Sequence, residues 1–281
     1  MKSNENTFEP YVPDLGLVYP EKPDGRMTSF KIRHDVIVDK NYPFLDKTFK
    51  FKFLRCLGYL ALFTLGPIVC FLRFGLKIEG RGNLRKHREI LKNGAMTVCN
   101  HVQRWDFIFV VIAVRFHMMY FPVWKEQLKS SDAGLIRVVG GIPVPDDIQT
   151  INYFNRAFDE IHAHKKWIHV YPESSRFDYF QPIRPFKKGV FTMAHRYDLP
   201  VLPLAISWRK PLRFPVTLDN IFRSLKGEKK LPMITIRIGE PVLIDKSLGR
   251  KEAVLKLRKD CHEAVVSLAG IRDNPYPAEG N

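Results

Sequence analysis

His101 and Asp106 are the two side chains of this sequence best placed for acid–base chemistry. They lie at the junction of two apolar runs. Residues 95–99 form a short run with strand character, and residues 107–114 form a run long enough for a buried helix. Because ligands of α/β folds bind at the edge where strands end and helices begin, this junction is a natural position for a base and a carboxylate.

The spacing of five residues constrains how the two side chains can meet. On an ideal α-helix, residues i and i+5 point about 140° apart, so the two groups cannot touch if both residues lie in mid-helix. They can meet if His101 lies in the turn and Asp106 in the first helical turn, where a negative charge is favoured. Asp106 would then hold one imidazole nitrogen and leave the other free as a general base. A surface histidine beside a helix-capping aspartate would show the same spacing.

A second group of polar residues follows another predicted strand. Residues 167–171 read as a strand that Pro172 ends, and Glu173 and Arg176 come directly after it. Arginine binds phosphate with two parallel hydrogen bonds, a geometry that lysine lacks. Arg176 is therefore suited to an anionic ligand, and a local salt bridge between Glu173 and Arg176 is the alternative interpretation.

Together these segments resemble the glycerolipid acyltransferase superfamily, in particular the 1-acyl-glycerol-3-phosphate (lysophosphatidate) acyltransferases. That family carries, in order, Asn-His-x4-Asp, Gly-x-Ile-x-Val/Ile-x-Arg, Pro-Glu-Gly-x-Arg and a proline-containing apolar strand. A Lys-x-Glu/Gln-Leu stretch lies between the first two blocks. The resemblance covers residues 95–208, and the matching segments of this chain are residues 100–106, 125–128, 140–146, 171–176 and 201–203.

Two positions depart from the family pattern. Ser174 stands where the family usually has glycine, so the turn after Glu173 is expected to differ. Asp146 stands where the second block often has arginine, which removes one phosphate ligand. The second departure bears on the identity of the acceptor more than on the type of reaction.

The resemblance implies an α/β fold with a mixed sheet flanked by helices. It also implies transfer of an acyl group from acyl-CoA or acyl carrier protein to a lysophospholipid hydroxyl, with no covalent intermediate and no cofactor beyond the acyl thioester. His101 would be the general base and Asp106 would orient it. Lys125 and Arg176 would contact the phosphate, and Glu173 would orient Arg176 or contact the glycerol. The substrate-binding residues implied in this way are Asn100, Lys125, Glu173 and Arg176.

Other chemistry on these residues is less favoured. Cys99 and His101 are two residues apart, so in an extended segment they share one face, and a thiolate nucleophile is conceivable. A strand cysteine, however, is usually inert core. No metal site is predicted, because no matching Cys or Asp set lies at ligand spacing around the histidine-rich segment His162, His164 and His169.

The formal net charge of +16 indicates an anionic partner, either lipid or nucleic acid. The sequence has no zinc-finger spacing, RNA-binding sheet motif or basic heptads, so nucleic acid is not expected. The four cysteines form no CxxC motif, which suits a reducing compartment. A non-catalytic protein of lipid surfaces or nucleic acid is the alternative from another functional class.

An uncharged apolar run over residues 56–72 provides a specific reason to expect a membrane. As a helix it would span roughly 25 Å, less than the ~30 Å hydrocarbon core, and Gly66-Pro67 would kink or break it. Both flanks are basic: residues 31–55 hold seven Lys/Arg against three Asp/Glu, and residues 73–92 hold seven against two. Because a single span leaves one flank poorer in Lys/Arg, we expect a re-entrant or interfacial helical pair on the cytoplasmic face. A full span and a buried core helix are the alternatives.

The expected organisation has three parts. Residues 1–30 form a proline-rich extended arm without the pattern of a secretory signal, residues 31–75 a membrane-associated helical element, and residues 76–281 an α/β acyltransferase domain. Alternation of strands and helices supports the α/β class. Periodicity predicts helices over residues 149–164, after Lys188 and over 254–268, and a strand over 233–239.

Overall fold

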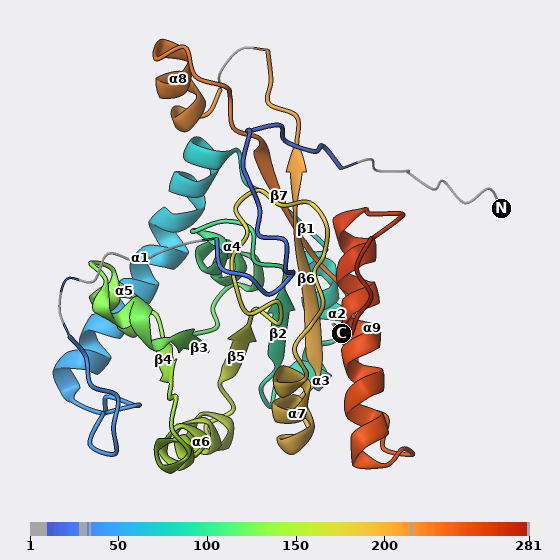
Figure 1. The fold of residues 1–281 in the computed structure, drawn as a ribbon. Helices are drawn as coiled ribbons and strands as arrows, with labels where there is room; N and C mark the ends of the chain where they lie inside the picture. Colours follow the sequence, from blue (N-terminus) through green and yellow to red (C-terminus); the bar gives the residue numbers. More distant parts are fainter. Residues whose placement is uncertain (1–9, 28–32, 34, 214–215, 280–281) are drawn as a thin grey trace.

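A seven-stranded mixed sheet forms the centre of the computed structural model, which describes residues 10–27, 33, 35–213 and 216–279 (Figure 1). The strand order is β1-β7-β6-β2-β5-β3-β4. Five strands run parallel, and β7 pairs antiparallel with β6, so β7 and β1 run against the others. The strands are β1 (Lys77–Glu79), β2 (Met96–Cys99), β3 (Met119–Trp124), β4 (Gly141–Val144), β5 (Trp167–Val170), β6 (Val201–Arg209) and β7 (Met233–Ile238).

Helices cover both faces of this sheet, which confirms the predicted α/β class. One apolar core lies between the sheet and helices α1 and α4, and a second lies between the sheet and helices α6, α7 and α9. Alternate residues of β2 serve the two cores: Cys99 faces the first, whereas Met96 and Val98 face the second. The helices are α1 (Phe49–Phe74), α2 (Arg81–Lys86), α3 (Arg88–Leu91), α4 (Asp106–Val114), α5 (Ala133–Val138), α6 (Ile148–Ala163), α7 (Lys188–Arg196), α8 (Leu218–Leu225) and α9 (Arg250–Ala269), with a 3₁₀ turn η1 (Lys125–Lys129).

The elements predicted from periodicity lie close to the expected positions. Helix α6 has its N-cap at Asp147, whose carboxylate accepts a hydrogen bond from the N–H of Thr150 at 2.7 Å. Helices α7 and α9 and strand β7 are likewise confirmed. Of the predicted arm over residues 1–30, only residues 10–27 are described, and they contain no helix or strand.

The apolar segment folds as one continuous helix and not as a helical pair. Helix α1 runs through Gly66 and Pro67 for 26 residues, about 39 Å at 1.5 Å per residue. It begins before the apolar run because Thr48 caps its first turn, accepting a hydrogen bond from the N–H of Phe51. Among the described residues just before α1, which are residue 33 and residues 35–48, there is no second helix. The predicted break is therefore wrong, and the helix is long and apolar enough to cross a membrane.

Most apolar side chains of α1 are exposed, which argues against the core-helix alternative. Besides its share of the first apolar core, the helix is held to the sheet by polar contacts. The buried Tyr59 hydroxyl accepts a hydrogen bond from the N–H of Met119 at 2.9 Å and donates to the carbonyl of Val139 at 2.7 Å. Arg55 donates to the carbonyl of Met119 at 2.8 Å. These contacts fix α1 to the start of β3.

Replacing Tyr59 with phenylalanine removes the acceptor for a buried backbone N–H. We expect Tyr59→Phe to lower the free energy of unfolding by about 1–3 kcal/mol. Denaturant titration in mild detergent measures the change. The matched control is Tyr153→Phe on the exposed side of α6, where Tyr153 is 39% exposed and little change is expected. Equal stability of the two variants would contradict the anchoring role of Tyr59.

Candidate active site

The ends of two neighbouring parallel strands bring the polar segments together. Strands β2 and β5 are paired in register, with Met96 opposite Ile168, so the loops that follow them leave the sheet at the same edge. The β2 loop carries His101 and the β5 loop carries Glu173. The N–H of His101 donates to Oε2 of Glu173 at 2.9 Å. The candidate site therefore lies at the carboxyl edge of the sheet, as the sequence predicts.

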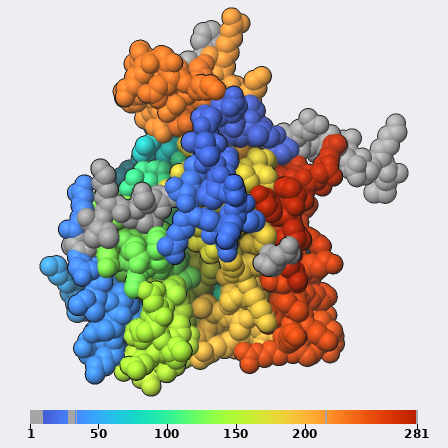
Figure 2. Space-filling view, viewed as in Figure 1, coloured from blue at the N-terminus to red at the C-terminus, as the bar shows by residue number. Residues whose placement is uncertain are grey.

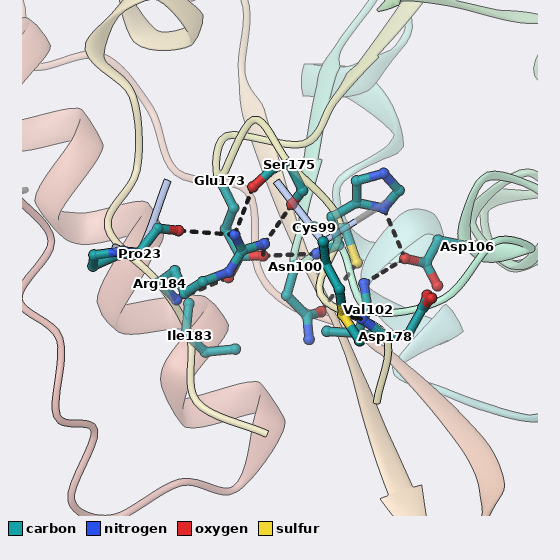
Figure 3. Close-up of polar contacts among 12 residues, drawn as sticks. Pro23, Cys99, Asn100, Val102, Asp106, Glu173, Ser175, Asp178, Ile183 and Arg184 are labelled. Carbon is teal, nitrogen blue, oxygen red and sulfur yellow. Dashed lines mark hydrogen bonds and ion pairs between the residues drawn. The ribbon is translucent and has the colours of Figure 1, made fainter. Parts of the chain in front are cut away.

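His101 and Asp106 meet in the geometry that their spacing permits. Figure 3 shows Asp106 and its hydrogen bond from Val102. His101 lies in the turn after β2, and Asp106 is the first residue of α4. Nδ1 of His101 lies 3.0 Å from Oδ2 of Asp106. The same oxygen accepts hydrogen bonds from the N–H groups of Val102 at 2.7 Å and Gln103 at 2.9 Å. The carboxylate is thus fixed by backbone donors and itself fixes the imidazole ring.

Burial controls the protonation of this pair. It lowers the pKa of His101 to about 3, and the nearby charge of Arg176 acts in the same direction. Burial also raises the pKa of Asp106, whereas its hydrogen bonds from Gln103 and Val102 favour the ionised carboxylate. An oxygen that accepts two backbone N–H groups carries no proton, so the proton shared with His101 lies on Nδ1. Nε2 of a neutral His101 is then the nitrogen that can accept a proton.

An aromatic side chain from the neighbouring loop supports the imidazole. The Tyr171 ring stacks on His101 with centroids 4.0 Å apart and an interplanar angle of 12°. Behind it, the buried His169 contacts the edge of Tyr171 and shares a hydrogen bond of 2.8 Å with the Thr97 hydroxyl. Tyr171 lies in a segment that resembles the family, but its contact with His101 was not predicted, because strand periodicity does not indicate which ring packs on a histidine.

Glu173 pairs with Arg184, a residue that the sequence analysis did not single out. Its carboxylate accepts hydrogen bonds from the Arg184 N–H at 2.8 Å and from the guanidinium at 2.9 Å. Both side chains are buried, with at most 1% of their surface exposed. The expectation that Glu173 orients Arg176 is therefore corrected. Arg184 follows Glu173 by 11 residues in an irregular segment, where no periodic signal relates the two.

Arg176 lies at the rim of the site and forms an ion pair of 2.8 Å with Asp178. Its side chain is 16% exposed, and its charge is close enough to lower the pKa of His101. The structure thus places the charge of Arg176 near the His101–Asp106 pair. Ser174, which replaces the family glycine, has φ +64°, the left-handed conformation that glycine favours. The turn therefore keeps the conformation that glycine would adopt.

Asn100 and Lys125 are placed differently from Arg176. The buried Asn100 amide is fully engaged with the backbone of Ile206 on β6, donating at 2.9 Å and accepting at 2.8 Å. Asn100 therefore positions the β2 loop, which differs from the expected substrate contact. Lys125 opens η1 and forms an ion pair with Asp146. Asp146, which departs from the family pattern, thus partly neutralises the charge of Lys125, the expected second phosphate ligand.

Cys99 has the environment of a core residue. It is fully buried, and burial raises the pKa of its thiol well above the ordinary value. Its Sγ lies 3.4 Å from the side-chain oxygen of Asn100, to which the thiol donates. A thiolate nucleophile is disfavoured at this position.

The N-terminal arm crosses the loops of the candidate site, as the dark blue trace in Figure 1 shows. The Pro23 carbonyl accepts a hydrogen bond of 2.9 Å from Arg184, and the Tyr19 hydroxyl donates to the Asp178 carbonyl at 3.0 Å. The Tyr19 ring also packs on Phe180, with centroids 4.7 Å apart. Residues far apart in the sequence thus share the wall of one site.

Part of this chain is similar to known acyltransferases. Residues 75–207 match the family model described as Acyltransferase, a segment that includes strands β1 to β5, most of β6 and the loops carrying His101 and Glu173. The chain is 27% identical over 173 residues to an uncharacterised acyltransferase of Schizosaccharomyces pombe, covering 58% of this chain and 56% of the relative. The chain therefore spans about half the length of that curated relative.

A solved structure is also similar to this chain. It is the 1-acyl-sn-glycerophosphate (LPA) acyltransferase PlsC of Thermotoga maritima, with a TM-score of 0.47 and 18% sequence identity. The match covers 80% of this chain and 85% of that structure.

Glu173→Gln tests the buried ion pair. The substitution leaves the Arg184 charge buried without its carboxylate, so we expect the free energy of unfolding to fall by about 3–5 kcal/mol. The control is Asp24→Asn, which breaks the exposed Lys187–Asp24 pair and should change the stability little. Denaturant unfolding of both variants gives the comparison. A Glu173→Gln protein as stable as Asp24→Asn would show that the pair does not hold the loops.

Proposed function

We propose that this chain, whose residues 75–207 match the family model described as Acyltransferase, transfers a fatty acyl group from an acyl thioester to the free hydroxyl of 1-acyl-glycerol-3-phosphate. The donor is acyl-CoA or acyl carrier protein, and the products are phosphatidate and the free thiol. The observation that supports this most directly is the His101–Asp106 pair at 3.0 Å, on the loop edge of the sheet. The side chain of His101 is 17% exposed, so the base is reachable from solvent while its partner is not.

The proposed chemistry is direct transfer with His101 as general base. Nε2 of His101 takes the proton of the acceptor hydroxyl as the oxygen attacks the thioester carbonyl carbon. The carbon–sulfur bond then breaks, and the thiolate leaves with the proton that the imidazolium returns. Asp106 stabilises the imidazolium while it exists. Positioned proton transfer of this kind contributes about 10²–10⁴-fold to the rate.

The acceptor phosphate is assigned to Arg176. Its guanidinium can offer two parallel donors to a phosphate once the exposed side of the Asp178 pair opens. A second candidate function has its own observation. The ion pair of Lys125 with Asp146 weakens the second phosphate contact, which favours a related enzyme that acylates another lysophospholipid, or another hydroxyl or amine acceptor.

The proposed location is the cytoplasmic face of a membrane. Helix α1 exposes a long apolar surface that includes Phe49, Phe53, Leu57 and Phe71, and basic segments flank it on both sides. A lysophospholipid and its acylated product reside in the bilayer, so an enzyme that joins them to a soluble acyl carrier must work at the surface. The partners are therefore the bilayer, the lysophospholipid and the acyl carrier, and no nucleic acid is proposed.

Loss of the base should abolish transfer. We expect His101→Ala to lower kcat by about 10²–10⁴-fold, and Asp106→Asn to lower it strongly while the fold is kept. The assay measures free thiol released from acyl-CoA that depends on added lysophosphatidate. His164→Ala, at the exposed end of α6, is the matched control and should retain full activity.

Two outcomes would contradict the proposal in different ways. Activity of His101→Ala within tenfold of wild type would remove the residue from the role of base. Thiol release that requires another acceptor, in a panel of lysophospholipids, alcohols and amines, would replace lysophosphatidate by the second candidate function.

The lowered pKa of His101 also predicts the pH dependence. A base acts in its neutral form, so activity is lost only as the pH falls through the pKa of His101 in the folded protein. Because burial places that pKa below its ordinary value of 6.5, the acidic limb of kcat/KM should lie below pH 6.5. A profile of kcat/KM against pH measures this. An acidic limb at or above 6.5 would show that the base is not held in a desolvated site.

A further inference from the structure

Helix α8 presents its apolar face to solvent. Leu218, Ile221, Phe222 and Leu225 recur at helical spacing and form one stripe. All four are exposed, Phe222 by 62% and Leu225 by 80%. The stripe of a helix in a soluble protein normally faces the core, so this orientation requires another apolar environment. Figure 2 shows α8, in orange, projecting from the body of the molecule.

The polar side of α8 holds it to the protein. The buried Asn220 amide accepts a hydrogen bond from the N–H of Leu231 at 2.7 Å and donates to its carbonyl at 2.9 Å. Asp219 pairs with Arg73 at 2.8 Å, and Thr217 caps the first turn. These contacts set the rotation of the helix about its axis. The outward direction of the apolar stripe is therefore built into the fold.

Helix α8 adjoins the end of α1. Arg73 lies in the last turn of α1, and its ion pair with Asp219 joins the two helices directly. The same turns of α1 expose Ile68 and Phe71 by 57% and 65%. Exposed apolar side chains are thus present on both helices, which are joined at the end of α1 that lies near the candidate site. The Arg73 guanidinium also lies 5.0 Å from the ring centroid of Trp105, the residue before Asp106.

The charge around α8 matches an anionic surface. Residues 209–230 contain seven Lys/Arg and two Asp/Glu. Both acidic residues are paired, Asp219 with Arg73 and Glu228 with Arg223. Apolar side chains on one face with basic residues beside them are the pattern of a helix that lies in the headgroup region of a bilayer.

We propose that α8 is a second membrane-docking element, which inserts its apolar stripe into an anionic bilayer next to the end of α1. This inference rests on the proposed membrane association of the chain, but its test does not depend on acyl transfer. With α1 alone, the protein could rotate about a single helix axis. With α8 as well, the protein contacts the membrane through two helices. The loop of His101 and Asp106 is then held beside the membrane plane.

Vesicle binding tests the proposal. The full chain is mixed with phosphatidylglycerol–phosphatidylcholine vesicles, and the bound fraction is measured by flotation. We expect Phe222→Ser with Leu225→Ser to weaken binding to the vesicles by about tenfold or more, because the variant no longer buries these two apolar side chains in the bilayer. The matched control, Ile148→Ser with Leu243→Ser, changes two side chains that are 87% and 53% exposed elsewhere and should bind like wild type.

Vesicle binding of the α8 variant equal to wild type would overturn the proposal. If that variant also lost a self-association that the wild type shows in analytical ultracentrifugation, the stripe would be an interface between two copies of the chain, which likewise overturns the membrane assignment. Unchanged melting temperatures of both double variants are expected, because all four side chains are exposed.

A second measurement reports the depth of α8 directly. In a Cys56→Ser background, an environment-sensitive dye is attached through Phe222→Cys or, as the control, through Ser224→Cys. Both positions are exposed, but only Phe222 lies on the apolar stripe. With vesicles, the dye at position 222 should shift to the blue and be quenched by bromine-labelled lipid, whereas the dye at position 224 should change little. Equal responses at the two positions would contradict insertion of this face.

Discussion

The buried carboxylate of Glu173 connects the parts of the site. It accepts hydrogen bonds from the backbone of His101 after β2 and from the backbone and side chain of Arg184. Arg184 in turn donates to the Pro23 carbonyl of the N-terminal arm and to the Ser175 hydroxyl. A charge taken out of water is tolerated only where such donors surround it. The position of the base therefore depends on a group that takes no part in the proposed proton transfer.

The sequence allowed the pair of His101 and Asp106 to be predicted because both depend on local order. A strand, a turn and a helix start are encoded within a dozen residues, and periodicity reveals each of them. The partner of Glu173 was predicted incorrectly because Arg184 and Arg176 both follow it in irregular backbone. Only the folded path of residues 173–187 decides which arginine is enclosed and which stays at the rim.

The two amphipathic surfaces illustrate a second limit of sequence analysis. The apolar run of α1 was evident, but its continuity through Pro67 and its start at Phe49 depend on the Thr48 cap and on the contacts of Tyr59 with β3. For α8, periodicity defines a stripe without saying what the stripe faces. Asn220, through its hydrogen bonds to Leu231, turns that stripe away from the core. The contacts of one buried amide thus help to determine that the apolar stripe of α8 faces solvent.

The crossing of the arm over the site has a consequence for how the chain is made. Pro23 contacts Arg184, which is 161 residues further along, and Asp14 pairs with Lys229. A ribosome produces the arm first, yet its docking partners emerge only after most of the sheet has been synthesised. Such long-range contacts form slowly, because closing the intervening chain costs entropy before the contacts are made. The arm over residues 10–27 is thus made before the residues that hold it, and a partly synthesised chain has an incomplete wall around His101.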